Sequence, residues 1–453
     1  MNKDKLQILA GENHPTSESK IESNNTPVLR GYSRRDVLRT AAFSAVGLAL
    51  SGRAFAGTGS DSEISGGGKP GPLQSAGVLA FGSDNTLFVG DITGAAVHAF
   101  VLSDSDSTPQ TGVELGNFHN FEGRDLIKGI DQKLAALLGT TYDQIVVNDM
   151  VVHQPSQQVF ISVERGRGTN AIPAIVKVNH GTLEVLNLDS IQHSQVTIPN
   201  EPDDKAMLEF EPQRTFAITD VKYYKGEVFV TGVSNQRFAS TLYRIPYPFN
   251  KEMATSTVEI WHPVHGEFET RAPIIRHLVK EANGEAHLYA VYGCTPLVRF
   301  PLASLKDGAH VRGDVIGELG YGSNPLDMLT FTSPFDQKEY LLVTIDVRSA
   351  SQIAVADLAS APTEPTGVPI DFGPGGLGRT QRNLPIKAEH IAVLNPKWAV
   401  VIQRHPKTSY RLDLSTIMIP YFFERKDGMS EMNWPGGPDP FQYRPHVQEL
   451  DHI

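Results

Sequence analysis

The chain has 453 residues, of which 40% are hydrophobic and 20% charged, and it contains 40 Gly and 30 Pro. This length and apolar content exclude a disordered protein and a single small domain. The formal net charge of -11 argues against a surface that neutralises nucleic-acid phosphates, so we expect no nucleic-acid partner. The single cysteine, Cys294, excludes an intramolecular disulfide and the paired-cysteine motifs of zinc fingers and c-type haems.

Residues 1–56 have the three-part layout of a signal peptide for export. Adjacent arginines lie within Ser33 to Arg39, an uncharged run extends from Thr40 to Gly52, and Ala54 to Ala56 fits an A-x-A cleavage site. The uncharged run is too short to span a bilayer as a helix, so no transmembrane anchor is expected. The Ser-Arg-Arg motif and the Val-Leu after it resemble the twin-arginine signal. That resemblance implies passage through the twin-arginine translocase to the periplasm or the outside of the cell.

The rest of the chain divides into a leader and one domain. Residues 57–76 are rich in Gly and Ser and predict a flexible leader. Residues 77–453 predict a single domain, in which helical spacing of apolar residues is confined to Arg124 to Gly139. The remaining pattern is typical of short strands separated by turn-forming residues.

The predicted strands recur in six groups of four. In chain order they are 78–81, 86–89, 96–102 and 113–116; 150–153, 158–163, 174–178 and 183–188; 221–224, 227–231, 241–245 and 257–261; 278–280, 286–291, 297–301 and 314–319; 328–332, 340–345, 352–358 and 367–371; and 391–394, 398–403, 410–414 and 418–423. Each four-stranded meander would expose an apolar face alone, and radial packing buries such faces. The expected fold is therefore all-β, a six-bladed β-propeller, with seven blades or a pair of β-sandwiches as alternatives.

Several phrases carry a family resemblance. Residues 81–91 resemble a blade of the NHL and gluconolactonase-like propellers. The phrases 134–141, 147–150, 238–242 with 245–249, and 294–298 are similar to a wider group of exported bacterial propeller proteins. The resemblance implies a propeller and export, and no activity attaches to it. Gluconolactonase-like and paraoxonase-like propellers hold a divalent metal in the central channel, which the resemblance implies for this chain too, although it offers more His and fewer Asn.

The register of the blades predicts a ring of polar residues. If the first strand of each blade is innermost, the residue before it lies at the channel mouth; these residues are Asp149, Asp220, His277, Asp327 and His390, with Gly77 in the first blade. Converging carboxylates and imidazoles require water, hydrogen bonds or a cation. The aspartates suit calcium, and the histidines suit zinc or copper. The alternative is that each aspartate bonds backbone N–H groups where one blade meets the next.

Loops on the same face supply candidate ligand-binding residues. They are Arg165, Asn235, Arg237, Cys294 and Arg348. Arginine can hold an anion with two hydrogen bonds, and the alternative is a solvated rim. Cys294 is interpreted as a buried apolar residue, a soft metal ligand or a nucleophile.

A further candidate lies in the connection Trp261 to Glu269, where His262 and His265 stand three residues apart. His265 with His277, His390 and Cys294 would make a softer set of ligands, suited to zinc or copper.

Two functions are compatible with these patterns. In the first, the protein is a metal-dependent hydrolase of a small lactone or ester, in which Asp149, Asp220 and Asp327 hold the cation and His277 or His390 carries the proton. In the second, it is a non-catalytic propeller that binds a small molecule or another protein of the cell envelope. A propeller fold does not choose between them.

Overall fold

The computed structural model describes residues 71–103, 125–179, 181–208, 211–282, 284–294, 296–320, 324–346, 349–367, 375–378, 380–383, 388–404, 411–419 and 423–424. The chain divides into two units, residues 1–66 and 67–453, and the described residues all belong to the second. The predicted signal segment therefore lies outside them. Among the described helices, none has the length and apolar character needed to cross a membrane.

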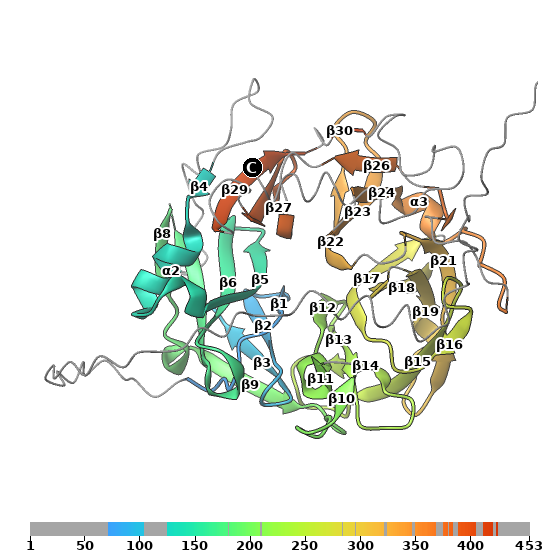
Figure 1. Cartoon of the computed structure of the whole chain (residues 1–453), viewed down its shortest axis with the longest axis horizontal. Helices are drawn as coiled ribbons and strands as arrows, with labels where there is room; N and C mark the ends of the chain where they lie inside the picture. The colour runs from blue at the N-terminus through green and yellow to red at the C-terminus, as the bar shows by residue number, and fades with distance from the viewer. Residues whose placement is uncertain are drawn as a thin grey trace, which may run out of the picture. The chain divides into compact units, whose positions relative to one another are not determined.

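The second unit is a six-bladed β-propeller (Figure 1). Each blade is built on an antiparallel path of strands that runs from the axis to the rim, and blade 3 adds one parallel strand. Blade 1 contains β1 (Leu79–Phe81), β2 (Thr86–Asp91), β3 (Ala96–Val101) and β9 (Gln192–Thr197). Blade 2 contains β5 (Ile145–His153), β6 (Gln158–Arg165), β7 (Ile172–Asn179) and β8 (Thr182–Val185). Blade 3 contains β12 (Asp220–Tyr224), β13 (Glu227–Val233), β14 (Ser240–Pro246), β15 (Ala254–His262) and β16 (Glu267–Glu269), with β20 (His310–Arg312) parallel to β15.

The other three blades follow the same plan. Blade 4 contains β17 (Ile274–Ala282), β18 (Glu285–Tyr292), β19 (Pro296–Pro301), β21 (Asp314–Glu318) and β25 (Gly375–Gly376). Blade 5 contains β22 (Pro325–Thr332), β23 (Glu339–Ile345), β24 (Ala350–Ala354), β26 (Thr380–Asn383) and β30 (Phe423–Glu424). Blade 6 contains β27 (Ala388–Asn395), β28 (Trp398–Arg404), β29 (Leu412–Met418) and β4 (Asp125–Ile127). The helices α2 (Ile130–Leu138) and α3 (Val355–Leu358) and the hairpin β10 (Met207–Leu208) and β11 (Glu211–Pro212) connect the blades.

The blades do not follow one another around the ring in chain order. At the axis β1 lies between β5 and β12, and β27 lies beside β5, so the order is blade 2, 1, 3, 4, 5, 6. Blade 1 is completed by β9, which comes after blade 2 in the chain, and blade 6 by β4, which comes before it. Blades 1 and 6 are therefore each completed by a strand that is separated in the sequence from the rest of the blade.

This topology corrects several predicted elements. The helix expected over Arg124 to Gly139 begins at Ile130, because 125–127 pair with β29 as a strand. The strand expected over 418–423 is wrong, since β29 ends at 418 and 423–424 join blade 5. The strand expected over 352–358 ends at 354, and blade 5 takes β26 as its next strand. The segment 113–116 and most of 367–371 lie outside the described residues.

Residues at the end of the expected leader are packed on blade 1. Leu73 and Ala76 are buried, and the Ser75 hydroxyl donates to Asp91 Oδ1 at 2.8 Å. Residues 71–76, which the composition assigned to a flexible leader, are therefore packed against the propeller.

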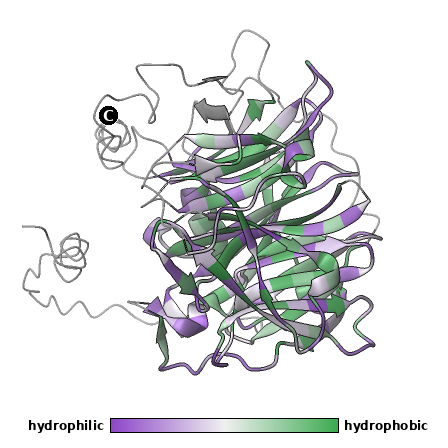
Figure 2. Ribbon diagram, turned by 90° about the vertical axis from the view of Figure 1, so that its right-hand side faces the viewer, coloured by the Kyte–Doolittle hydropathy of each residue, from purple (hydrophilic) through white to green (hydrophobic). Residues whose placement is uncertain are grey.

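Each pair of neighbouring blades encloses its own apolar cluster, and the described residues form six such clusters. Successive side chains of a strand point to opposite faces of its sheet. In β2, Leu87 and Val89 therefore pack against blade 2, while Phe88 between them packs against blade 3. Figure 2 shows the same pattern, with hydrophobic colour along the stacked strands and hydrophilic colour in many of the connecting loops.

Substitution of Gly232 on β13 tests how closely this strand packs against the backbone of Ala217. A Cβ at this position would lie 2.1 Å from the backbone oxygen of Ala217, so Gly232→Ala forces the backbone apart. We expect it to lower the free energy of unfolding by about 1–3 kcal/mol, measured by urea denaturation. Gly378→Ala is the control, because a Cβ there meets nothing within 4 Å. Equal stability of both variants and the wild type would contradict this packing.

Candidate functional site

The inner strands bring the five predicted ring residues to the axis. Asp149, Asp327 and His390 are 5%, 6% and 8% exposed, while Asp220 and His277 are completely buried. We call these five residues, together with Arg276 and Lys222, the axial cluster. Apart from Lys222, whose side chain is 31% exposed, its side chains are almost fully removed from solvent, so each of their charges requires a partner within the protein.

Each aspartate of the axial cluster accepts a backbone hydrogen bond from the next blade. The pairs are Asp149 with the Leu79 N–H, Asp220 with the His277 N–H and Asp327 with the Ile391 N–H, each at 2.8 Å. These bonds join blade 2 to blade 1, blade 3 to blade 4 and blade 5 to blade 6. The six blades are thus joined in three pairs. Bonding to backbone N–H groups is the role of the aspartates that the sequence left open as the alternative to metal binding.

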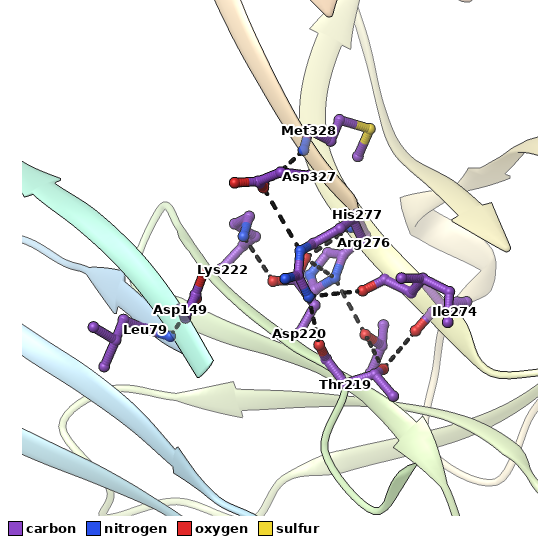
Figure 3. Close-up of polar contacts among 12 residues, drawn as sticks. Leu79, Asp149, Thr219, Asp220, Lys222, Ile274, Arg276, His277, Asp327 and Met328 are labelled. Carbon is purple, nitrogen blue, oxygen red and sulfur yellow. Dashed lines mark hydrogen bonds and ion pairs between the residues drawn. The ribbon is translucent and has the colours of Figure 1, made fainter. Parts of the chain in front are cut away.

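Arg276 supplies a cation at the axis, and the sequence pattern did not single it out. A shift of register between Ile274 and Arg276 lets two consecutive residues of β17 reach the axial cluster. Arg276 Nη1 donates to the Thr219 carbonyl at 3.1 Å, and Nε lies 3.6 Å from Asp327 Oδ1 (Figure 3). Burial lowers the pKa of Arg276, but the neighbouring aspartates outweigh burial and hold that pKa above its usual value.

Asp220 is paired with two basic side chains, Lys222 and His277. Its Oδ1 lies 2.7 Å from Lys222 Nζ, and its Oδ2 lies 3.1 Å from His277 Nδ1. Burial raises the pKa of Asp220, but Lys222, His277 and Arg276 outweigh that effect and lower the pKa below its usual range. Burial lowers the pKa of His277. Asp220 is therefore an ionised carboxylate in a structural ion pair.

Asp149, Asp327 and His390 form a closer group in which one ligand atom of each lies within 4.8 Å of the others. Burial raises the pKa of both carboxyls. For Asp149 the neighbouring His390, 3.6 Å away, and Arg276 outweigh burial and lower the pKa, whereas the pKa of Asp327 stays raised, with the charge of Asp149 adding to burial. These three residues can hold a cation. Asp220 is outside their group, and Arg276 already places a positive charge beside Asp327.

A second group lies where blade 3 meets blade 4, and we call it the hairpin cluster. It consists of His262, His265, Glu269, Cys294 and Glu318. The first three come from the β15–β16 hairpin, whose turn closes through the Gly266 N–H donating to the His262 carbonyl at 2.9 Å. Cys294 follows β18, and Glu318 ends β21.

The hairpin cluster lies on the face of the axial residues. Tyr292, two residues before Cys294, pairs with Ile274, two residues before Arg276. The end of β18 and the start of β17 therefore lie at the same end of blade 4.

Glu269 orients both histidines of the hairpin cluster. Its Oε1 accepts from His262 Nδ1 at 2.8 Å and from His265 Nδ1 at 2.5 Å. Because a carboxylate only accepts, both rings carry a proton on Nδ1. Burial raises the pKa of Glu269, but the two histidines outweigh it and lower this pKa to about 2. Hydrogen bonds to Cys294 and Glu269 raise the pKa of His265 to about 10.

The hairpin cluster extends from the surface to a buried floor. Cys294 is partly exposed and hydrogen bonds the His265 imidazole, whose side chain is 34% exposed. The backbone at Cys294 is left-handed, with φ 62°, which is uncommon for a residue other than glycine and clusters at functional sites. His262 and Glu318 are completely buried beneath them, with His262 Nε2 3.7 Å from Glu318 Oε2.

The structure therefore divides the softer ligand set expected from the sequence. His265 and Cys294 lie together with His262, whereas His277 and His390 belong to the axial cluster. The short i, i+3 spacing of His262 and His265 in a hairpin was the available signal for this group. Cys294 is remote in sequence and joins it only through the packing of blade 4 on blade 3.

The other predicted ligand-binding residues are dispersed. Arg165 is exposed at the end of β6, and Asn235 Nδ2 donates to the Glu201 carbonyl at 3.1 Å. Arg237 lies over the Phe238 ring, 5.5 Å from its centroid, and lines a hollow of about 590 Å³ at blade 3. Arg348 lies outside the described residues.

Comparison with known proteins bears on the fold alone. The structure is similar to native Bacillus subtilis arabinanase Arb43A, with 11% identity and a TM-score of 0.30 over 60% of this chain and 93% of that one. It is also similar to the full extracellular region of plexin A4, with 8% identity and a TM-score of 0.32 over 80% of this chain and 52% of that one. The chain thus spans about half of the plexin. No protein-family model matches the chain, and no curated protein is detectably similar to it.

The ion pair of Asp220 gives the stability a defined pH dependence. Asp220→Asn keeps an acceptor for the His277 N–H but removes the charge facing Lys222, and we expect it to lower the free energy of unfolding by about 2–3 kcal/mol at pH 7. A lowered folded pKa stabilises the protein above the unfolded value of about 3.9, and the stabilisation is lost as the pH falls below it. The difference between wild type and variant should therefore be constant from pH 5 to 7 and shrink below about pH 4.

Urea denaturation across this pH range measures that difference. Asp204→Asn, in an exposed loop, is the control and should leave the stability unchanged. A penalty for Asp220→Asn that is absent at pH 7, or that grows in acid, would contradict the ion pair.

Proposed function

We propose that the protein is a thiol-dependent hydrolase of small esters or lactones and that its reaction takes place at the hairpin cluster. The observation that carries the proposal is the hydrogen-bonded series Cys294, His265 and Glu269. A thiol beside an imidazole, which is in turn oriented by a carboxylate, is the arrangement of an activated nucleophile. Cys294 and His265 are also the exposed members of the cluster, so a substrate can reach them from solvent.

Each residue then has a defined part in the reaction. His265 holds the thiol proton while Cys294 Sγ attacks the carbonyl carbon, so that a C–S bond forms and the carbonyl electrons move to oxygen. The intermediate collapses with cleavage of the ester C–O bond, and His265 passes the proton to the leaving alcohol. Water, activated by His265, then cleaves the thioester, releases the acid and restores the thiol. Glu269 keeps the ring of His265 in one tautomer and orientation throughout.

The axial cluster has the features of a structural element. Its aspartates are engaged by backbone N–H groups of neighbouring blades, and Arg276 provides the positive charge that a metal would otherwise bring. A metal-dependent reaction at the channel mouth would have to displace these contacts. We therefore place the chemistry at the hairpin cluster. The export signal predicted in residues 1–56 would put this activity in the periplasm or outside the cell.

Hydrolysis of a panel of small activated esters and lactones by the purified full chain tests the proposal. Cys294→Ser should lower kcat/KM by about 10³-fold or more, because a serine in this setting is a far weaker nucleophile. His265→Asn should lower it by about 10²–10⁴-fold, the usual contribution of a general base.

His310→Asn is the matched control, since the His310 side chain is also 34% exposed and lies on blade 3. It should retain the wild-type rate. Full activity in Cys294→Ser, with folding confirmed by circular dichroism, would refute the thiol mechanism. Loss of activity only in axial variants such as Asp149→Asn would return the chemistry to the channel mouth.

A further inference from the structure

We infer that the hairpin cluster is also a binding site for one Zn²⁺ ion, with His262, His265, Cys294 and Glu318 as its ligands. This inference goes beyond the hydrolase and does not rest on it, because it uses two residues, His262 and Glu318, that have no part in the reaction. Two imidazoles, a thiolate and a carboxylate are the ligand types that Zn²⁺ binds in proteins.

The two histidines are prepared for coordination. A metal-bound histidine commonly donates its second N–H to a carboxylate, which fixes the tautomer and directs the other nitrogen at the metal. Glu269 accepts from Nδ1 of both His262 and His265, so Nε2 is the coordinating nitrogen in each ring. Binding of one ion by both histidines would explain why a single carboxylate orients both imidazole rings.

The buried floor of the cluster requires a cation. His262 Nε2 has no hydrogen-bond partner among the described residues, although the side chain is completely buried. This nitrogen lies 3.7 Å from Glu318 Oε2, a completely buried carboxylate oxygen. The separation is too long for a hydrogen bond, and a lone pair facing a carboxylate in a buried site is unfavourable. A bound cation would give His262 Nε2 a partner and would be attracted by the nearby carboxylate.

Three of the four ligand atoms lie close enough together to bind one zinc ion, and the fourth lies beside one of them. Zinc–ligand bonds of about 2.0–2.3 Å place neighbouring ligand atoms of a tetrahedron about 3.3–3.8 Å apart. The 3.7 Å between His262 Nε2 and Glu318 Oε2 falls in this range. The three atoms offered by His262, His265 and Cys294 lie within 4.8 Å of one another. Glu318 lies outside this group of three, so it becomes the fourth ligand only if its carboxylate moves toward His265 and Cys294.

Occupancy of this site would have two consequences. His262 and His265 belong to blade 3, and Cys294 and Glu318 to blade 4, so the ion would tie these blades together on the channel-mouth face. The ion would also take the sulfur of Cys294 and the second nitrogen of His265. Bound Zn²⁺ would thus protect the thiol and prevent its attack on a substrate.

Titration of the metal-free full chain with Zn²⁺ in a calorimeter tests the site. We expect one equivalent per chain and an increase of the melting temperature, since an ion that binds only the folded state stabilises it. Replacement of Zn²⁺ by Co²⁺ should give a thiolate-to-cobalt charge-transfer band that disappears in Cys294→Ser.

His262→Asn is the decisive variant. Its amide keeps a donor near the position of Nδ1, toward Glu269, but lacks the Nε2 ligand, so we expect affinity for Zn²⁺ to fall by about 100-fold or more. Glu318→Gln should weaken binding as well. His193→Asn, at a histidine of blade 1, is the control and should bind as the wild type does. These measurements read the metal directly, so they decide the site whether or not the thiol hydrolyses esters.

Two results would overturn the inference. One is Zn²⁺ binding that is unchanged in His262→Asn and Cys294→Ser, which would place the ion elsewhere. The other is the absence of a stoichiometric Zn²⁺ heat and of a charge-transfer band in the folded wild-type protein. Loss of binding in Asp149→Asn alone is a case of the first result and would assign the ion to the axial cluster.

Discussion

The ring depends on the hydrogen bond that each of three aspartates accepts from a backbone N–H of the next blade. Asp149, Asp220 and Asp327 stand on alternate blades around the ring, so the six blades are clasped in three pairs. A hydrogen bond to a buried carboxylate contributes roughly 1.5–3 kcal/mol only while the carboxylate stays ionised. Positive charge from Arg276 and Lys222 favours the ionised form of Asp220, and Arg276 and His390 favour that of Asp149.

This structural use of the axial aspartates is the reason that we propose the hairpin cluster, and not the axis, as the reactive site. The carboxylates that the sequence assigned to a metal are engaged in holding blades together, and Arg276 lies among them. The hairpin cluster lies toward the same face but outside the axis, where β15 and β16 of blade 3 meet β18 and β21 of blade 4. It combines exposed reactive groups, His265 and Cys294, with a buried histidine whose Nε2 has no partner among the described residues. The rigid ring fixes the spacing between the two blades that supply this cluster.

The features of the fold that depend on local sequence patterns were predictable. Alternation of apolar residues identified the strands and the six blades, and the position before each inner strand identified Asp149, Asp220 and Asp327 as residues of the axis. Pairing partners were not predictable, because β4 and β9 join strands that lie far away in the chain, and periodicity reports burial rather than partnership. Arg276 escaped notice because a register shift in β17 lets two consecutive residues reach the axis. The meeting of Cys294 with His262 and His265 depends on packing between two blades, which no spacing in the sequence encodes.

The central claim is that Cys294 forms a covalent intermediate at the hairpin cluster. Rapid acid quenching of the full chain during turnover of an activated ester, followed by proteolysis and mass spectrometry, tests it most directly. We predict an acyl group on the peptide that contains Cys294, with an occupancy that falls as the ester is consumed. Steady hydrolysis of the ester with Cys294 unmodified at every time point, or with the acyl group on another residue, would contradict it.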